Sequence, residues 1–512
     1  MAGAAFIGAD ERASNYEARI TIYVVLACIV AASGGLLFGY DIGISGGVTS
    51  MDPFLKEFFP VVYRRKHSPT ASTDDHYCKY DNQGLAAFTS SLYIAGLIAT
   101  FGASYTTRVF GRKPTILIGG CSFLIGAGLN AGAVNLAMLI IGRIMLGVGV
   151  GFGNQAVPVY LSEMAPPKFR GGLNMLFQLA TTLGILIANC VNYGTQNIKP
   201  WGWRLSLGLA AVPASLMTFG GLFLPETPNS LVQRGHLKEG KAILEKIRGT
   251  TGVEAEYQDL LEASDVAKTV KHPFRNIFKP TSRPQLVMAF FLPAFQLLTG
   301  INSILFYAPV LFQSLGFGGS ASLYSSVLTG AVIVFASLLT IATVDRWGRR
   351  KLFMLGGVLM VVCQVAIAII LAVKYQGQES LSKQNSALVV VLVCFFVLGF
   401  GWSWGGLGWL VPSEIFPLET RSAGQSITVA VNLLFTFAIA QSFLAMLCAF
   451  KFGIFLFFAA WEAIMTLYVF FLLPETMNVP IEEMINVWRK HWFWKNVVPP
   501  ASVDREQQLA VK

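Results

Sequence analysis

The chain has 512 residues, of which 54% are hydrophobic and only 13% are charged, with a formal net charge of +10. Soluble domains contain roughly 25% charged residues, so this composition excludes an ordinary soluble protein and indicates lipid as the main solvent. The sequence contains no CxxC pair and no HExxH motif, so we expect no metal site and no cofactor.

Apolar stretches free of charge follow one another along the chain. A membrane-spanning helix needs about 20 mostly apolar residues. The run 284–344 is long enough for two crossings, with a break at 316–320, and the run 452–473 is interrupted by Glu462. The sequence predicts an all-α membrane protein with twelve transmembrane helices, which lie in 20–40, 82–107, 114–142, 144–162, 171–198, 205–225, 284–344, 352–373, 384–413, 422–450 and 452–473.

Two short basic loops set the expected orientation. Segment 106–114 has three positive and no negative charges, and segment 345–351 has four positive charges and one negative. Loops rich in Lys and Arg lie on the cytoplasmic side, and both segments follow even-numbered helices. We therefore expect both termini and the central loop in the cytoplasm. The positive net charge is then a topology signal, and no nucleic-acid partner is expected.

Three polar motifs occur twice in the same order. The pairs are TRVFGRK with DRWGRR, SEMAPPKFRGG with SEIFPLETRSAG, and PETPNS with PETMN. Their near-constant offset predicts two six-helix halves, an arrangement typical of the major facilitator superfamily. The expected parts are a first half at 20–225 with an extracellular loop at 46–84, a linker with short amphipathic helices at 226–285, a second half at 286–473 and a cytoplasmic tail at 474–512.

Opposite charges recur at the helix ends of both halves. Glu163 with Arg170, and Glu414 with Arg421, are the pairs this pattern predicts. Such pairs would close the cytoplasmic side and release it when the halves move; ordinary positive-inside anchors are the alternative. We call these residues the cytoplasmic latch: Glu163, Arg170, Arg108, Arg112, Asp345, Arg346, Arg349, Arg350, Glu414, Arg421, Glu226 and Glu475.

One carboxyl group interrupts the first apolar stretch. Asp41 lies in GGLLFGYDIGISGG, and an ionisable residue inside the membrane is a functional candidate with a partner to be named. Arg143, directly before the charge-free stretch 144–162, is the partner the sequence offers. If their separation changes during transport, proton binding becomes coupled to conformation. A static ion pair is the alternative.

Several long motifs carry a family resemblance. GGLLFGYDIGISGGVTSM, GRIMLGVGVGFGNQAVPVYLSEMAP, PETPNSL, LTGINSILFYAPVLF, DRWGRR and GWLVPSEIFPLETRSAGQS together resemble the plant sugar transport protein family, from about residue 20 to residue 495. These proteins are proton-coupled monosaccharide symporters of the sugar-porter branch. The resemblance implies a plasma-membrane sugar importer driven by the proton gradient, and no enzyme. An uncoupled facilitator and a non-transporting sugar sensor are the alternatives.

The resemblance also assigns individual residues. It gives the proton to Asp41 and the pairing role to Arg143, and it implies an extracellular disulfide between Cys78 and Cys448, which the cysteine positions alone leave open. A sugar site needs amide donors and acceptors between apolar faces. The expected sugar ligands and walls are Gln178, Gln296, Asn302 and Asn432, with Phe38, Ile42, Trp409 and Phe306.

Some residues depart from the family pattern. Leu297 and Ile333 replace two expected amide residues, and each would leave a sugar hydroxyl unpaired at a cost of about 1–3 kcal/mol. This loss predicts a shift towards pentoses such as xylose or arabinose, with weak hexose transport as the alternative. Gly406 replaces a proline, and Glu462 lies mid-span, where it is either protonated or turned into a packed interface.

Overall fold

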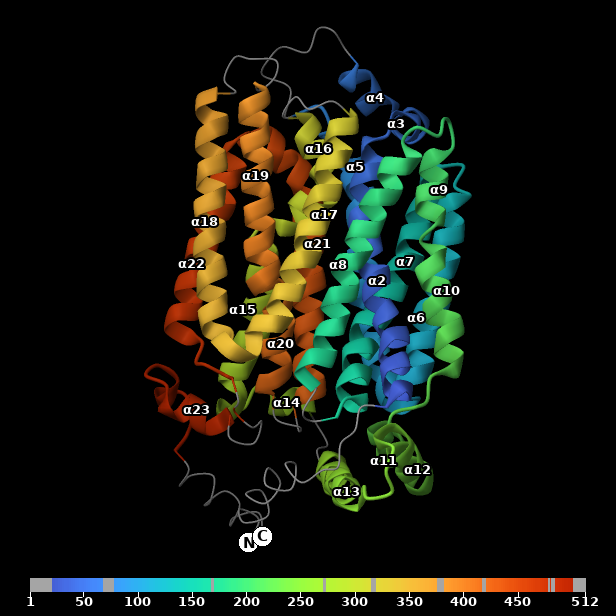
Figure 1. Cartoon of the computed structure of the whole chain (residues 1–512), viewed down its shortest axis with the longest axis vertical. Helices are drawn as coiled ribbons and strands as arrows, with labels where there is room; N and C mark the ends of the chain where they lie inside the picture. The colour runs from blue at the N-terminus through green and yellow to red at the C-terminus, as the bar shows by residue number, and fades with distance from the viewer. Residues whose placement is uncertain are drawn as a thin grey trace.

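The computed structural model describes residues 21–67, 78–166, 170–269, 273–314, 319–374, 382–416, 420–477, 479 and 484–500. Every regular element in these residues is a helix. Eleven of the described helices are long and apolar enough to cross a membrane, and Figure 1 shows them running along the long axis of the molecule. The prediction of an all-α membrane protein is confirmed.

The first half of the chain supplies six crossings. Polar side chains cap the start of three of them: Thr21, Asn82 and Asn135 accept hydrogen bonds from the backbone nitrogens of Val24 at 3.3 Å, Leu85 at 3.0 Å and Met138 at 2.8 Å. The crossings are α2 (Ile22–Ser50), α5 (Gln83–Val109), α6 (Arg112–Ala131), α7 (Leu136–Met164), α8 (Arg170–Thr195) and the pair α9 (Gly202–Gly208) and α10 (Ala211–Phe223).

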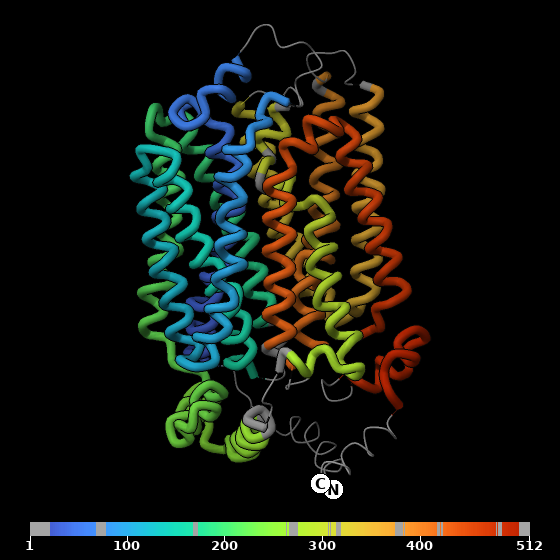
Figure 2. The backbone as a smooth tube through the Cα atoms, turned by 180° about the vertical axis from the view of Figure 1, so that it is seen from behind, coloured from blue at the N-terminus to red at the C-terminus, as the bar shows by residue number. Residues whose placement is uncertain are grey.

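The second half repeats this set, with interruptions in two crossings. Its helices are α15 (Arg283–Leu298) with α16 (Ile301–Ser314), α17 (Gly319–Trp347), α18 (Arg349–Lys374), α19 (Lys383–Phe400) with η4 (Gly401–Gly405) and α20 (Gly406–Ile415), α21 (Arg421–Phe450) and α22 (Gly453–Leu472). Figures 1 and 2 show the helices of the two halves as two bundles side by side.

The crossing made by α15 and α16 is broken near its middle. Gly300 separates the two helices with a φ of +78°, a conformation that favours glycine. In Figure 1, α16 lies above α15 in the bundle. The two short helices together form one crossing, which adds to the eleven long helices and brings the total among the described residues to twelve. A second irregularity is η4, a π-helical turn that ends directly before Gly406. Such turns leave carbonyl groups outside the regular helical ladder.

The glycine-rich sequence of α2 is a packing surface. A Cβ atom added to Gly39 would lie 1.8 Å from the Thr181 carbonyl oxygen of α8, and one added to Gly43 would lie 2.8 Å from that of Ile185. Gly147 on α7 makes a similar approach, 2.2 Å, to the Leu92 carbonyl of α5. Only glycine permits these distances, which allow the helices to pack backbone to backbone.

Short helices cover both ends of the bundle. At one end lie α3 (Asp52–Phe58) and α4 (Pro60–Lys66); at the other lie α11 (Pro228–Gln233), α12 (Leu237–Arg248), α13 (Glu254–Thr269), α14 (Pro273–Asn276) and α23 (Met484–Lys490) (Figure 1). Arg248 ties the linker to the bundle: its Nη1 donates to the carbonyl oxygen of Met164 at 3.0 Å, and its Nη2 pairs with Glu256 at 2.7 Å.

A disulfide joins the two halves at the α3–α4 end. Cys78, which follows α4 in the chain, is bonded to Cys448 near the end of α21. Beside it, the Tyr80 hydroxyl donates to the side-chain oxygen of Gln313, on α16. The predicted disulfide is confirmed, and it links the segment between α4 and α5, in the first half, to α21, in the second half.

Removal of this disulfide should lower the melting temperature of the purified protein in detergent. We expect Cys78→Ser, Cys448→Ser and the double variant to lower it equally, by roughly 5 °C, because each change breaks the same long-range link. Cys190→Ser, at an exposed free thiol on α8, is the matched control. Unequal effects, or an equal effect in the control, would contradict a shared bond as the cause.

Candidate functional site

A buried ion pair joins α2 to α7. Arg143 donates from Nη1 to Oδ1 of Asp41, and the exposed fractions of the two side chains are 0% and 2%. The same guanidinium donates from Nη2 to Ser45 Oγ at 2.5 Å and from Nε to the Phe88 carbonyl oxygen at 2.9 Å. The structure thus brings the two predicted residues together and gives Arg143 three acceptors.

Two aromatic residues of α5 complete this site. The Phe88 ring centroid lies 4.4 Å from the guanidinium carbon of Arg143, a cation–π arrangement that suits a desolvated cation. The Tyr93 side chain lies close enough to Asp41 to interact with its carboxyl group. Sequence reasoning missed both residues as well as Ser45. The spacing of Ser45, one turn after Asp41, was a usable signal; a backbone carbonyl such as that of Phe88 leaves none.

Three of the predicted amide residues converge between the halves. Gln296, on α15, donates from Nε2 to the carbonyl oxygens of Trp404 at 3.0 Å and Gly405 at 2.9 Å. Its Oε1 accepts from Asn432 Nδ2, on α21, at 3.1 Å. Gln178, on α8, comes from the other half, and a Cβ atom added to Gly405 would lie 3.4 Å from its Nε2. These amides form one cluster around the π-helical turn η4, which we call the amide cluster.

The other predicted sugar-site residues lie on helices that pack around this cluster. Phe38 and Ile42 are buried on α2, Asn302 is half-buried at the start of α16, and Trp409 is half-buried on α20. α16 packs against α2, and α20 packs against α8. Leu297 on α15 and Ile333 on α17 are buried, and the side chain of Phe306 lies outside the described residues.

The latch residues of the first half gather at the start of α6. Arg112 pairs through Nη2 with Glu163, at the end of α7, at 2.6 Å, and Thr227 donates to the other carboxylate oxygen of Glu163 at 2.6 Å. Glu226 accepts from the backbone nitrogens of Arg112 at 2.9 Å and Lys113 at 3.3 Å. Glu226 therefore caps α6.

The second half builds the same arrangement at the start of α18. Arg349 pairs with Glu414 at 2.9 Å and with Asp345 at 3.2 Å. Glu475 accepts from the backbone nitrogens of Arg349 at 2.9 Å and Arg350 at 3.1 Å. The ion pairs described for these two clusters each join helices of one half. Arg108 and Arg346 are exposed, and the side chains of Arg170 and Arg421 lie outside the described residues.

Comparison with known proteins agrees with this geometry. The family model described as "Sugar (and other) transporter" matches residues 27–488. The chain belongs to the sugar transporter family. It is 67% identical over 494 residues to Sugar transport protein 7 of Arabidopsis thaliana, covering 96% of each protein. It is 66% identical over 492 residues to Sugar carrier protein A of Ricinus communis, covering 96% of this chain and 94% of the relative.

Solved structures show the same fold. The major facilitator superfamily proton:xylose symporter XylE, bound to 6-bromo-6-deoxy-D-glucose, matches with a TM-score of 0.77 and 25% identity over 92% of this chain and 100% of its own. A partially occluded inward-open form of XylE from E. coli matches with a TM-score of 0.73 and 23% identity over 90% and 100%. The predicted superfamily fold is confirmed, and the family is one of transporters, not enzymes.

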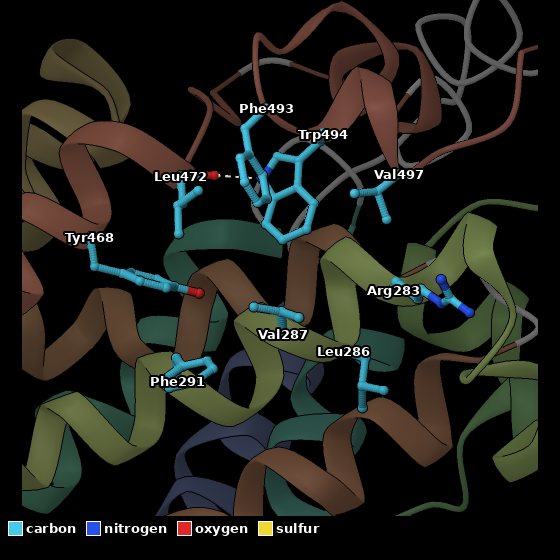
Figure 3. A pocket seen from close by; sticks show the side chains of 9 residues that line it. All are labelled: Arg283, Leu286, Val287, Phe291, Tyr468, Leu472, Phe493, Trp494 and Val497. Carbon is cyan, nitrogen blue, oxygen red and sulfur yellow. Dashed lines mark hydrogen bonds between the residues drawn. The ribbon is translucent and has the colours of Figure 1, made fainter.

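The transporter also contains an apolar cavity of about 540 Å³ away from the amide cluster. Figure 3 shows it between α15, α22 and the segment after α23, with Phe291, Tyr468 and Trp494 in its lining and Arg283 at its edge. The indole nitrogen of Trp494 already donates to the Leu472 carbonyl oxygen at 2.8 Å. With so few free polar groups, this cavity does not suit a sugar.

The contact between Asn432 and Gln296 gives a prediction about the sugar transporter's affinity. Asn432→Ala leaves Gln296 Oε1 without its donor, so we expect the KM for sugar uptake to rise roughly tenfold. The Gln296→Ala/Asn432→Ala double variant should be less impaired than the product of the single effects. Exposed Gln384→Ala is the control. A KM within about twofold of wild type for Asn432→Ala would exclude this pair from the sugar site.

Proposed function

We propose that this protein is a proton-coupled symporter that imports monosaccharides across the plasma membrane by alternating access. The observation that carries the proposal is the buried Asp41–Arg143 pair, which gives the membrane interior a group able to bind a proton. The similarity to XylE, a proton:xylose symporter, supports it. An uncoupled sugar facilitator would need no such group.

The proton site and the sugar site share a helix. α2 carries Asp41, and its glycines bring it into backbone contact with α8, which carries Gln178. α2 also packs against α16, which carries Asn302 near its start. A shift of α2 on protonation of Asp41 would therefore move amides of the amide cluster. This packing is the physical route by which proton binding changes sugar affinity.

Protonation of Asp41 removes the counterion of Arg143, but Arg143 keeps two hydrogen-bond acceptors. Losing one partner of a buried ion pair costs about 3–5 kcal/mol when the other charge is left alone. Here Ser45 Oγ and the Phe88 carbonyl oxygen still accept from Arg143, and the Phe88 ring still lies beside it. These contacts reduce the free-energy cost of the protonated state, so both states of Asp41 can be populated during a transport cycle.

Hydrogen bonds link the two halves on both sides of the amide cluster. Towards the α3–α4 end, Ser90 donates to Gln441 at 2.6 Å. Towards the other end, Gln155 donates to Ser426 at 3.3 Å. Alternating access would open one set while the other stays closed. The two cytoplasmic-latch clusters lie at the second end, where we propose that they hold the helix ends of each half, 20–225 and 286–473, as rigid units.

The end with α11–α14 faces the cytoplasm in this proposal. The basic segments 106–114 and 345–351, which contain Arg112 and Arg349, lie at the helix ends there, as the positive-inside rule requires. The end with α3, α4 and the disulfide then faces the extracellular side, where disulfides persist. Both chain termini are placed in the cytoplasm by the same rule.

The preferred sugar is proposed to be a pentose such as xylose or arabinose. Leu297 directly follows Gln296, and Ile333 lies against η4, since a Cβ atom added to Gly401 would be 3.2 Å from its Cγ1. Both side chains are apolar where the family resemblance leads us to expect amides. A sugar with fewer hydroxyl groups leaves fewer of them unpaired beside these residues.

Asp41→Asn should abolish the stimulation of sugar uptake by acidic external pH. The amide cannot bind a proton at these pH values, so the pH dependence is lost even where uptake of labelled sugar down its gradient survives. Uptake would be measured in transporter-deficient cells at acidic and neutral pH. Asp52→Asn, which removes an acid outside the membrane, is the control. Wild-type uptake that is indifferent to pH would favour the facilitator, and sugar binding without uptake would favour the sensor.

The pentose proposal predicts a gain of hexose transport. We expect Leu297→Gln with Ile333→Asn to raise the ratio of glucose to xylose uptake roughly tenfold, because two new amides pair with hexose hydroxyls. Leu297→Met with Ile333→Val retains apolar side chains and is the control. An unchanged ratio, or wild-type glucose uptake equal to that of xylose, would remove the basis of the pentose assignment.

A further inference from the structure

A second carboxyl group is buried in the membrane region, and neither the proton site nor the amide cluster uses it. Glu462 lies mid-way along α22 and is 0% exposed. Within the described residues, no Lys, Arg or His forms an ion pair with it. A carboxylate left unpaired in a transmembrane helix is strongly disfavoured, so the contacts of Glu462 must explain its presence.

The contacts of Glu462 lead to the break between α15 and α16. Its Oε1 accepts from Gln364 Nε2, on α18, at 2.9 Å. The same amide nitrogen donates to the carbonyl oxygen of Thr299 at 2.9 Å. Thr299 caps the end of α15, where carbonyl groups lack partners within the helix. Gln364 therefore satisfies a backbone group freed by the break, and Glu462 fixes the orientation of the Gln364 amide.

A second residue of α22 contacts the same break. Phe458, one turn before Glu462, packs so closely that a Cβ atom added to Gly300 would lie 2.6 Å from its Cδ2. Gln296 lies one turn before the break and Asn302 directly after it. The break therefore sets the relative position of two proposed sugar ligands, and α22 supports it from behind.

The hydrogen bonds of this group are incomplete for a carboxylate. Glu462 Oε2 and Gln364 Oε1 are both buried oxygen atoms without a donor among the described residues. Two acceptors and no donor would leave both unsatisfied in an apolar environment. One proton on the carboxyl group supplies the missing donor. Cys363, the neighbour of Gln364, is the other titratable group close enough to interact with Glu462.

We propose that Glu462 is held as a neutral carboxylic acid which, through Gln364, braces the α15–α16 break and so sets the distance between Gln296 and Asn302. Glu462 is thus a positioning residue for sugar binding, and this role rests on the proposed sugar site. It is distinct from Asp41, because Glu462 has no cation to stabilise its charged form and stays protonated through the cycle.

Uptake kinetics of three variants test the brace. Glu462→Gln keeps a neutral group with an acceptor oxygen, so its KM for xylose should stay within about twofold of wild type and its pH profile should not change. Glu462→Leu and Gln364→Leu should each raise the KM roughly tenfold. Their double variant should be no worse than either alone, because both remove the same link. Thr466→Val is the control, because it removes a half-buried hydroxyl that donates to the backbone carbonyl oxygen of Glu462 and leaves the carboxyl group untouched.

Several outcomes would overturn the proposal. A KM for Glu462→Leu equal to wild type would show that the brace is not needed. Glu462→Gln as impaired as Glu462→Leu, or with an altered pH profile, would show that the residue carries charge or moves a proton. Surface abundance is measured for every variant, so that loss of folding is not taken for loss of affinity.

An infrared measurement tests the protonation state without transport. Purified wild-type protein at neutral pH should show a carbonyl absorption of a neutral carboxylic acid that is missing from Glu462→Gln. If the wild type lacks this absorption, or if Glu462→Gln retains it in full, the proposal is overturned. If the wild type takes up no sugar, the proposed function fails, whereas this band still decides the state of Glu462.

Discussion

The ion pair between Asp41 and Arg143 is the constraint on which the first half of the molecule depends. Two opposite charges can lie in a membrane only if they meet, and their helices must then pack closely enough for the contact. Gly34 of α2 lies against Val157 of α7, and Gly147 packs α7 against α5, the helix that carries Phe88. Ser45 and the Phe88 carbonyl oxygen accept from the remaining donors of Arg143. Helix packing and the chemistry of the pair are thus one requirement.

The helix ends beside α11 and α14, which we propose face the cytoplasm, are also held by pairs of opposite charge. Gly111 and Gly348 adopt φ values of +104° and +84°, which turn the chain tightly before α6 and α18. Glu226 and Glu475 then accept from the free backbone nitrogens of those helices, while Arg112 and Arg349 pair with Glu163 and Glu414. Each basic loop is both a topology signal and the fixed end of a helix.

The sequence predicted those features of the structure that depend on the polarity of side chains. The spans follow from apolar length, and the meeting of Asp41 with Arg143 follows from the scarcity of charge in lipid. It did not predict contacts made by the backbone. The Trp404 and Gly405 carbonyls that orient Gln296 depend on a π-helical turn, and Arg248 reaches a helix end far away in the chain. The break at Gly300 was likewise not foreseen, although the motif containing it was recognised.

Asp41 and Glu462 are both carboxyl groups buried in the membrane region, and the proposals give them different roles. Asp41 faces a guanidinium, so its charged form has a partner, and its protonated form leaves Arg143 with the acceptors that it already has, Ser45 Oγ and the Phe88 carbonyl oxygen. Glu462 faces an amide, which can donate to it but carries no charge. A proton can therefore leave Asp41 without stranding a charge, whereas one leaving Glu462 would create an unpaired anion in the membrane. In the proposed mechanism the partner, and not burial, decides which carboxyl group is able to couple a proton to transport.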